Sequence, residues 1–186
     1  CLTCGHQSVK WLGRCPECGE WNTFSEEVRT ASARKAPVRS VEARSIDEIS
    51  VEDVPRTLTG IGELDRVLGG GIVRGSLVLV AGEPGVGKST LLLAAAGKLA
   101  GRSAKVLYIS GEESLSQIKL RAQRLAVSGR GLSLAASTDV PALRGTLEDA
   151  GADLVIVDSI QTMYDPEIPT TAGSVAQVRE NTRFFM

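Results

Sequence analysis

The chain has 186 residues, a length that allows one ordinary domain and a small additional module. Its 21 Lys and Arg residues nearly balance its 22 Asp and Glu residues, so any nucleic-acid surface must be local. Hydrophobic residues make up 42%, which excludes a mostly disordered chain. No apolar stretch approaches the ~20 residues of a membrane span, so we expect no membrane partner. The sequence begins at Cys1 without a signal peptide, and we expect that the natural N-terminus is missing.

All four cysteines fall near the start of the chain in the pattern C-x2-C-x10-C-x2-C: Cys1, Cys4, Cys15 and Cys18. A two-residue gap lets both thiolates of a pair reach one metal ion, and Gly5 and Gly19 suit the tight turns of zinc knuckles. Disulfides are the alternative, but nothing indicates secretion and such bridges are rare in the cytosol. The pattern therefore predicts a four-cysteine zinc ribbon over residues 1–27.

Four thiolates complete a tetrahedron, so we expect His6 to be exposed rather than a ligand. So small a fold needs metal to hold it together, and its large apolar side chains are predicted to pack around the knuckles. These side chains are Trp11, Leu12, Trp21 and Phe24.

Residues 28–56 are interpreted as a linker that is first basic and then acidic. Val28–Arg44 carries five basic residues against the single acid Glu42, with no apolar period, so it is typical of a flexible linker that could also touch phosphates. Ser45–Val54 alternates apolar and acidic residues and predicts a short strand or helix.

Residues 57–186 alternate between predicted strands and helices, which indicates an α/β domain with a mostly parallel sheet. The predicted helices are Ile61–Leu68, the segment from the glycine loop to about Ala100, Leu115–Leu125, Val140–Ala150 and Gly173–Met186. The predicted strands are Ser76–Ala81, Lys105–Ser110, Leu132–Ala135 and Leu154–Ser159.

The buried strand predicted at Ser76–Ala81 runs directly into a phosphate-binding motif. The segment Gly82, Glu83, Pro84, Gly85, Val86, Gly87, Lys88, Ser89 and Thr90 satisfies G-x-x-x-x-G-K-[ST] between a strand and a helix. Its glycines let backbone N–H groups turn inward around phosphates at a helix N-terminus. We predict an ATP and Mg²⁺ site in which Lys88 reaches the β- and γ-phosphates, Ser89 ligates Mg²⁺ and Thr90 lies beside the α-phosphate. A chance glycine loop is the alternative.

Two carboxylates complete the predicted site. Leu154–Ser159 is predicted to be a central parallel strand with Asp158 at its carboxyl end, beside the glycine loop, where Asp158 would hold Mg²⁺ through a water. A structural aspartate is the alternative. Glu112 leaves the end of the strand Lys105–Ser110 and is favoured as the base that deprotonates water, which indicates hydrolysis. Glu113 is better suited to the start of the following helix.

These segments together resemble the RadA (Sms) family of bacterial DNA-repair proteins, which are RecA-superfamily ATPases. The resemblance rests on the ribbon with Lys10–Asn22, on Thr59–Gly71, on the glycine loop, on Gly111–Ser114 and on Asp158–Tyr164. It implies a RecA-like P-loop ATPase core and a DNA-dependent ATPase that drives branch migration of recombination intermediates. It places Glu112 and Lys88 at catalytic positions, and Lys88, Ser89 and Asp158 at nucleotide and magnesium positions.

The resemblance also implies partners and a location: single-stranded and branched DNA, a RecA-type recombinase, a homo-hexameric ring, and the bacterial cytoplasm at the nucleoid. Family members continue with more of the core, a Lys-Asn-Arg-Phe-Gly motif and a Lon-protease-like domain. We therefore expect this chain, which stops at Met186, to lack part of the sheet and any arginine finger, and to hydrolyse ATP weakly alone.

The loop Tyr164–Gly173 has two prolines and no apolar period, and the resemblance places it beside DNA. Thr170, Thr171 and Arg179 are the predicted contacts, although Asp165 and Glu167 would repel phosphates and the arginine could belong to a solvated helix face. Two other functions stay open. One is an ATP-gated binding switch like the circadian-clock relatives of RecA, and the other is a small-molecule kinase, which Gly111–Ser114 argues against.

Overall fold

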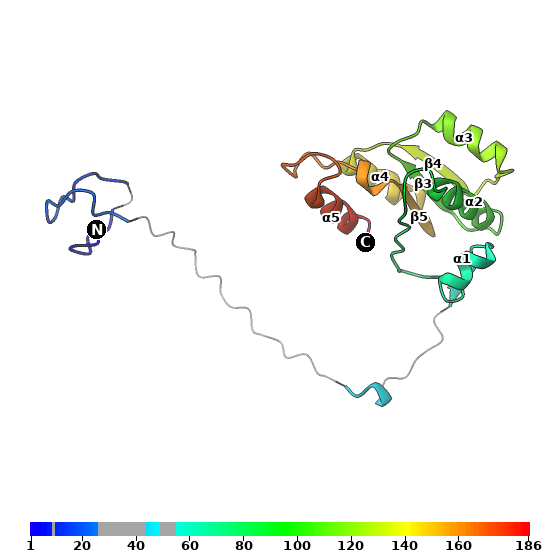
Figure 1. Cartoon of the computed structure of the whole chain (residues 1–186), viewed down its shortest axis with the longest axis horizontal. Helices are drawn as coiled ribbons and strands as arrows, with labels where there is room; N and C mark the ends of the chain where they lie inside the picture. Colours follow the sequence, from blue (N-terminus) through cyan, green and yellow to red (C-terminus); the bar gives the residue numbers. More distant parts are fainter. Residues whose placement is uncertain (9, 26–43, 49–54) are drawn as a thin grey trace. The chain divides into compact units, whose positions relative to one another are not determined.

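The structure, a computed structural model, describes residues 1–8, 10–25, 44–48 and 55–186 (Figure 1). The chain divides into two compact units, Cys1–Val51 and Glu52–Met186. Most of the predicted linker, residues 28–43 and 49–54, lies outside the described residues. Of the predicted short element at Ser45–Val54, the structure describes the start, where Ile46–Glu48 forms a 3-10 turn (η1).

The described residues 1–8 and 10–25 of the first unit are held by turns rather than by helices or extended strands. The amide of Gly5 donates to the Cys1 carbonyl at 3.0 Å, and the amide of Gly19 donates to the Cys15 carbonyl at 2.9 Å. Both glycines have positive φ, +75° and +76°, which a side chain disfavours. The two predicted knuckle turns are therefore present, each closed by a glycine.

The core of the second unit is a parallel sheet in the order β4-β3-β5, built from Leu132–Ala136 (β4), Val106–Ser110 (β3) and Leu154–Asp158 (β5). All five residues of β3 are buried, as expected for the strand in the middle. In the register of β3 with β5, Ser110 lies opposite Asp158. The carboxyl ends of the two strands therefore meet at one edge of the sheet. The prediction that Leu154–Ser159 is the central strand is wrong, because β3 occupies that position.

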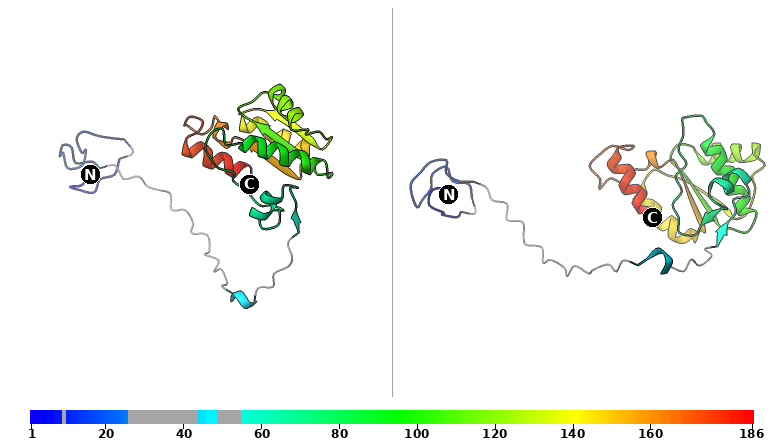
Figure 2. Two further views of the ribbon diagram at one scale, coloured as in Figure 1. Left: turned by 45° about the vertical axis from the view of Figure 1, so that its right-hand side comes forward. Right: turned by 60° about the horizontal axis from the view of Figure 1, so that its bottom comes forward.

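Helices cover both faces of this sheet (Figure 2). On one face, Lys88–Ala100 (α2) and Leu115–Arg124 (α3) pack on alternate side chains of β3, with Tyr108 in that core. On the other face, Val140–Ala150 (α4) packs on Leu107 and Ile109, with the end of Val175–Phe184 (α5) at its margin. The predicted α/β class is confirmed. In the described part of the chain, no helix combines the length and apolarity needed to cross a bilayer.

The strand predicted at Ser76–Ala81 is absent. The segment has no strand hydrogen bonds, and Leu77, Val78 and Leu79 are exposed by 56, 43 and 79%. The reason is that an apolar segment becomes a strand only when a neighbour pairs with it, and no described strand pairs with this one. Composition alone cannot supply that neighbour.

A small substructure precedes this segment. Arg56–Thr57 (β1) pairs antiparallel with Ile72–Val73 (β2), and the helix Gly62–Val67 (α1) lies between them in sequence. The buried carboxylate of Asp65 accepts hydrogen bonds from the hydroxyl and the amide of Thr59, both at 2.7 Å. These donors hold the pKa of Asp65 below its usual value, so the carboxylate is charged at neutral pH. Its hydrogen bonds to Thr59 fix the conformation of the loop before α1.

Candidate functional site

The four cysteines converge on one point, as predicted. Their sulfur atoms all lie within 4.8 Å of one another, with Cys1 and Cys18 separated by 3.7 Å and Cys4 and Cys15 by 3.6 Å. A tetrahedron with metal–sulfur bonds of about 2.3 Å has sulfur–sulfur edges of about 3.8 Å, so the donor set fits Zn²⁺. His6 does not belong to this group, but it is half-buried rather than exposed as predicted. A hydrogen bond from the Cys18 amide lowers the pKa of the Cys15 thiol to about 7, which favours the thiolate that a metal requires.

The predicted packing of large apolar side chains around the zinc knuckles is partly wrong. Trp11 is 67% exposed and Trp21 is 66% exposed, whereas Leu12 and Phe24 are half-buried. The guanidinium of Arg14 lies 5.9 Å from the centre of the Trp21 ring, and its Nε donates to the Gly19 carbonyl at 2.9 Å. The cluster of cysteine sulfur atoms is compact, so few side chains are covered around it.

The phosphate-binding motif forms an exposed turn that leads into α2. Gly85 and Gly87 have φ of +78° and +104°, which requires glycine, and α2 begins at Lys88. The ammonium of Lys88 curls back over the turn and donates to the carbonyls of Gly82 and Glu83 at 2.8 and 2.9 Å. The turn therefore places a cation and free helix N–H groups together, which is the arrangement that binds phosphates.

Asp158 ends β5 and lies on the face of the sheet that α2 covers. Its Oδ2 accepts a hydrogen bond from the Tyr108 hydroxyl, whose ring belongs to the core beneath α2. The peptide bond between Asp158 and Ser159 is cis. The predicted magnesium aspartate thus lies at the carboxyl edge of the sheet, on the side of the helix that follows the phosphate-binding turn.

The two consecutive glutamates after β3 have different environments. Glu112 is exposed, and one carboxylate oxygen accepts a hydrogen bond from the Ser159 hydroxyl at 2.7 Å. Glu113 forms an ion pair with Arg121 of α3, so its carboxylate is already bound to a cation. Glu112 is thus the carboxylate that remains accessible to solvent beside the end of β5.

A close approach fixes the turn between β3 and these glutamates. A Cβ on Gly111 would lie 2.1 Å from Oγ1 of Thr162, in the 3-10 turn Ile160–Thr162 (η2) that follows β5. The amide of Gly111 also donates to the Asp158 carbonyl at 3.0 Å. Only glycine allows the two segments to approach this closely.

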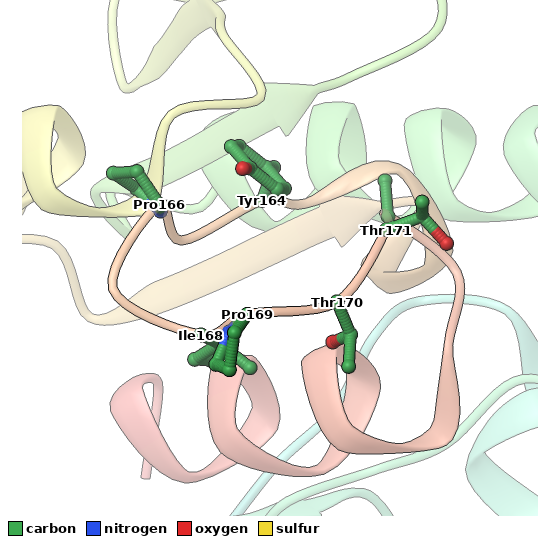
Figure 3. A pocket seen from close by; sticks show the side chains of 7 residues that line it. Tyr164, Pro166, Ile168, Pro169, Thr170 and Thr171 are labelled. Carbon is green, nitrogen blue, oxygen red and sulfur yellow. The ribbon is translucent and has the colours of Figure 1, made fainter.

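The loop after η2 encloses a surface hollow of about 550 Å³ (Figure 3). Its lining residues are Tyr164, Pro166, Ile168, Pro169, Thr170, Thr171 and Ala172. The hydroxyl of Thr170 accepts a hydrogen bond from Ser174 at 2.9 Å, and Thr171 is exposed. Arg179 is exposed on α5 and pairs with Glu180 at 2.9 Å, so its charge is partly neutralised.

Sequence reasoning missed the polar partners of these residues. Tyr108 stands two residues before Ser110 and so faces the same side as Asp158 across the sheet, a signal that strand register could have supplied. Ser159 follows the aspartate, but nothing in its own pattern indicates a bond to Glu112. Gln177 and Asn181, both buried in α5, were also missed, because they lie in a helix with polar residues throughout.

A parallel sheet with a glycine-rich phosphate turn before α2 and an aspartate at the end of β5 defines a P-loop nucleotide-binding domain. Comparison with protein families agrees, because the AAA domain family matches residues 47–178. The chain therefore belongs to the AAA domain family. A rubredoxin metal-binding domain matches residues 1–26, which supports zinc at the four cysteines.

The chain is similar to curated proteins named DNA repair protein RadA. It is 47% identical over 193 residues to that of Bacillus subtilis (strain 168), 46% over 190 residues to that of Listeria monocytogenes, and 43% over 195 residues to that of Brucella abortus (strain 2308). These alignments cover 100, 100 and 98% of this chain, which spans 42% of the length of each relative. The resemblance inferred from the motifs is confirmed.

Proposed function

We propose that the chain carries the ATP-hydrolysing core of a DNA-dependent ATPase in recombinational DNA repair. The observation that carries this proposal is the hydrogen bond between Ser159 and Glu112, which places an exposed carboxylate beside the strand end that bears Asp158. The similarity to the RadA proteins supports the repair role. The division into a ribbon (1–27), a linker (28–56) and a core (57–186) is part of the proposal.

We assign a separate role to each residue of the candidate nucleotide site. Bound at the phosphate turn, Mg²⁺–ATP supplies the γ-phosphoryl group that is cleaved. Lys88 exchanges its bonds to the Gly82 and Glu83 carbonyls for phosphate oxygens, while Ser89 and Asp158 hold the metal. Glu112 takes a proton from a water molecule as the water oxygen attacks the γ-phosphorus and the bond to the β-phosphate oxygen breaks.

We also propose how the free energy of ATP hydrolysis is used. Hydrolysis drives branch migration on single-stranded and branched DNA, in a hexameric ring that acts with a RecA-type recombinase in the bacterial cytoplasm. Thr170, Thr171 and Arg179 contact the DNA. The loop that holds the two threonines begins five residues after Ser159, so movement of the loop can reach the hydrolytic edge of the sheet.

The test is phosphate release by the full-length protein, with and without single-stranded oligothymidylate. DNA is expected to raise the rate, and Lys88→Ala is expected to abolish hydrolysis because no other cation of the motif can replace it. Lys98→Ala, on the same helix but exposed and far along it, is the matched control and should hydrolyse normally. A wild-type rate that DNA does not change would refute DNA dependence.

A further inference from the structure

Gln177 of α5 holds the loop after η2 from the inside. The residue is fully buried, yet its Nε2 donates to the carbonyls of Asp165, Ile168 and Thr170 at 2.9, 3.2 and 3.1 Å. Its Oε1 accepts from the Asp165 amide at 3.0 Å. A buried amide is stable only when its polar atoms are bonded, so these bonds tie the path of the loop from Asp165 to Thr170 to the position of the Gln177 side chain.

Asn181, one turn further along α5, connects Gln177 to the end of η2. It is 1% exposed, and its Nδ2 donates to the Met163 carbonyl at 2.9 Å and to Oε1 of Gln177 at 3.1 Å. The side-chain oxygen Oδ1 of Asn181 is buried without a hydrogen-bond partner among the described residues. The orientation of the Asn181 side chain is therefore fixed by the two hydrogen bonds that its Nδ2 donates.

The hydrogen bonds continue from η2 to the candidate base. The Thr162 hydroxyl donates to the Ser159 carbonyl at 2.8 Å, and the Ser159 hydroxyl donates to Glu112 at 2.7 Å. Met163, which accepts from Asn181, is the next residue after Thr162. A continuous series of bonds and adjacent residues thus joins the loop to Glu112.

We propose that Gln177 is a positioning residue that couples the conformation of this loop to the freedom of Glu112. The inference rests on the proposed function, in which the loop contacts DNA. When DNA draws the loop carbonyls away from Gln177, Asn181 and Met163 shift, and η2 moves with them. The Ser159 hydroxyl then leaves the Glu112 oxygen that must accept a proton. Such networks transmit a change only when their members move together, so cutting one link should uncouple the two ends.

The test compares two variants that remove one link each. Gln177→Met keeps the side-chain volume but loses every bond to the loop, and Thr162→Val removes the hydroxyl bond to Ser159 while keeping a branched side chain of similar size. The measured quantity is the ratio of ATP turnover with oligothymidylate to turnover without it, in the full-length protein. We expect each variant to lower this ratio by about 2- to 30-fold, the range typical of coupling residues, with the basal rate and the KM for ATP unchanged. Gln123→Met, an exposed glutamine on α3, is the matched control and should keep the wild-type ratio.

A second measurement does not depend on turnover. Amide hydrogen exchange of the peptide that contains Ser110–Ser114 should change when DNA binds to the wild type. This change should be absent in Thr162→Val. The buried contacts of Gln177 with the loop are intact in this variant. This variant keeps the test valid if Gln177→Met fails to fold. A wild type stimulated by DNA together with equal stimulation of Thr162→Val would overturn the inference and leave the proposed function standing. A wild type that DNA does not stimulate would overturn both.

Discussion

The Tyr108 hydroxyl lies 2.5 Å from Oδ2 of Asp158 and joins the middle of β3 to the end of β5. Tyr108 is 1% exposed, and burial, followed by the bond to Asp158, raises the pKa of its hydroxyl well above the usual value. The hydroxyl therefore stays protonated at neutral pH and donates to the carboxylate. One oxygen of Asp158 is thus fixed, which orients the other.

Tyr108→Phe should shift the Mg²⁺ dependence of hydrolysis to higher Mg²⁺ concentrations. The ring still fills the core, but the carboxylate loses its orienting donor, a change that typically lowers metal affinity or activity by about 10- to 100-fold. Mg²⁺ titration of ATP turnover without DNA measures this. Tyr164→Phe alters the other tyrosine of the chain, which is exposed, and should titrate like the wild type. Identical Mg²⁺ curves for both variants would show that the bond to Asp158 has no such role.

Glu112→Gln should slow ATP turnover by about 10²- to 10⁴-fold while ATP still binds, because the amide has the same shape but cannot accept a proton. Glu113→Gln is the matched substitution one residue away. It loses only the ion pair with Arg121 and should retain turnover. Single-turnover hydrolysis and nucleotide binding are measured on both variants. If Glu113→Gln were the slower of the two, the base would have to be reassigned.

Removal of zinc should unfold residues 1–25 and leave the second unit folded. Both tryptophans of the chain lie in the first unit, and the α-helices α1–α5 all lie in the second. Tryptophan fluorescence and helical circular dichroism therefore report on the two units separately. During chelation the fluorescence should change while the helical signal stays constant.

Metal analysis should give one zinc per chain for the wild type, and much less for Cys15→Ser. Thr3→Ala, in an exposed position between two of the cysteines, should keep its zinc. Loss of the helical signal at the same chelator concentration, or a wild-type protein without zinc, would contradict the prediction.

Two helical glycines should respond to alanine in opposite directions. A Cβ on Gly97 of α2 would lie 2.5 Å from Val127, so Gly97→Ala should destabilise the fold by about 1–3 kcal/mol through overpacking. A Cβ on Gly145 of α4 meets nothing within 4 Å, so Gly145→Ala should stabilise by about 0.5–1 kcal/mol. Denaturant unfolding followed by helical circular dichroism measures both. Changes of the same sign would mean that the packing around Gly97 relaxes freely.

All five predicted helices and three of the four predicted strands of the second unit are present, because their signals are local. The helix α4 begins after Asp139, whose side chain accepts from the Ala142 amide at 3.1 Å, and it is followed by Gly151, which has positive φ. Ser76–Ala81 shows the opposite case. Its apolar composition indicates a segment that favours burial, but strand pairing depends on partners far away in the sequence.

The residues of the candidate site also fall into two groups, those with a local sequence signal and those without one. Lys88, Asp158 and Glu112 could be named because each lies at or just after the boundary of an element, in a recognisable pattern. Their partners could not, because a contact such as Ser159 with Glu112 joins residues 47 positions apart and exists only through the register of β3 with β5. Gln177 carries no signal of its own, since its role arises from the fold of a loop without regular structure.

One edge of β5 has consequences for how the chain behaves in solution. The strand pairs with β3 on one side, no other described strand pairs with it, and Val155 is 37% exposed. Unpaired N–H and C=O groups on such an edge can template pairing with a second molecule. Any association of the chain through this edge would be an edge-to-edge contact unrelated to nucleotide. An oligomer of this chain seen at high concentration is thus not in itself a functional ring.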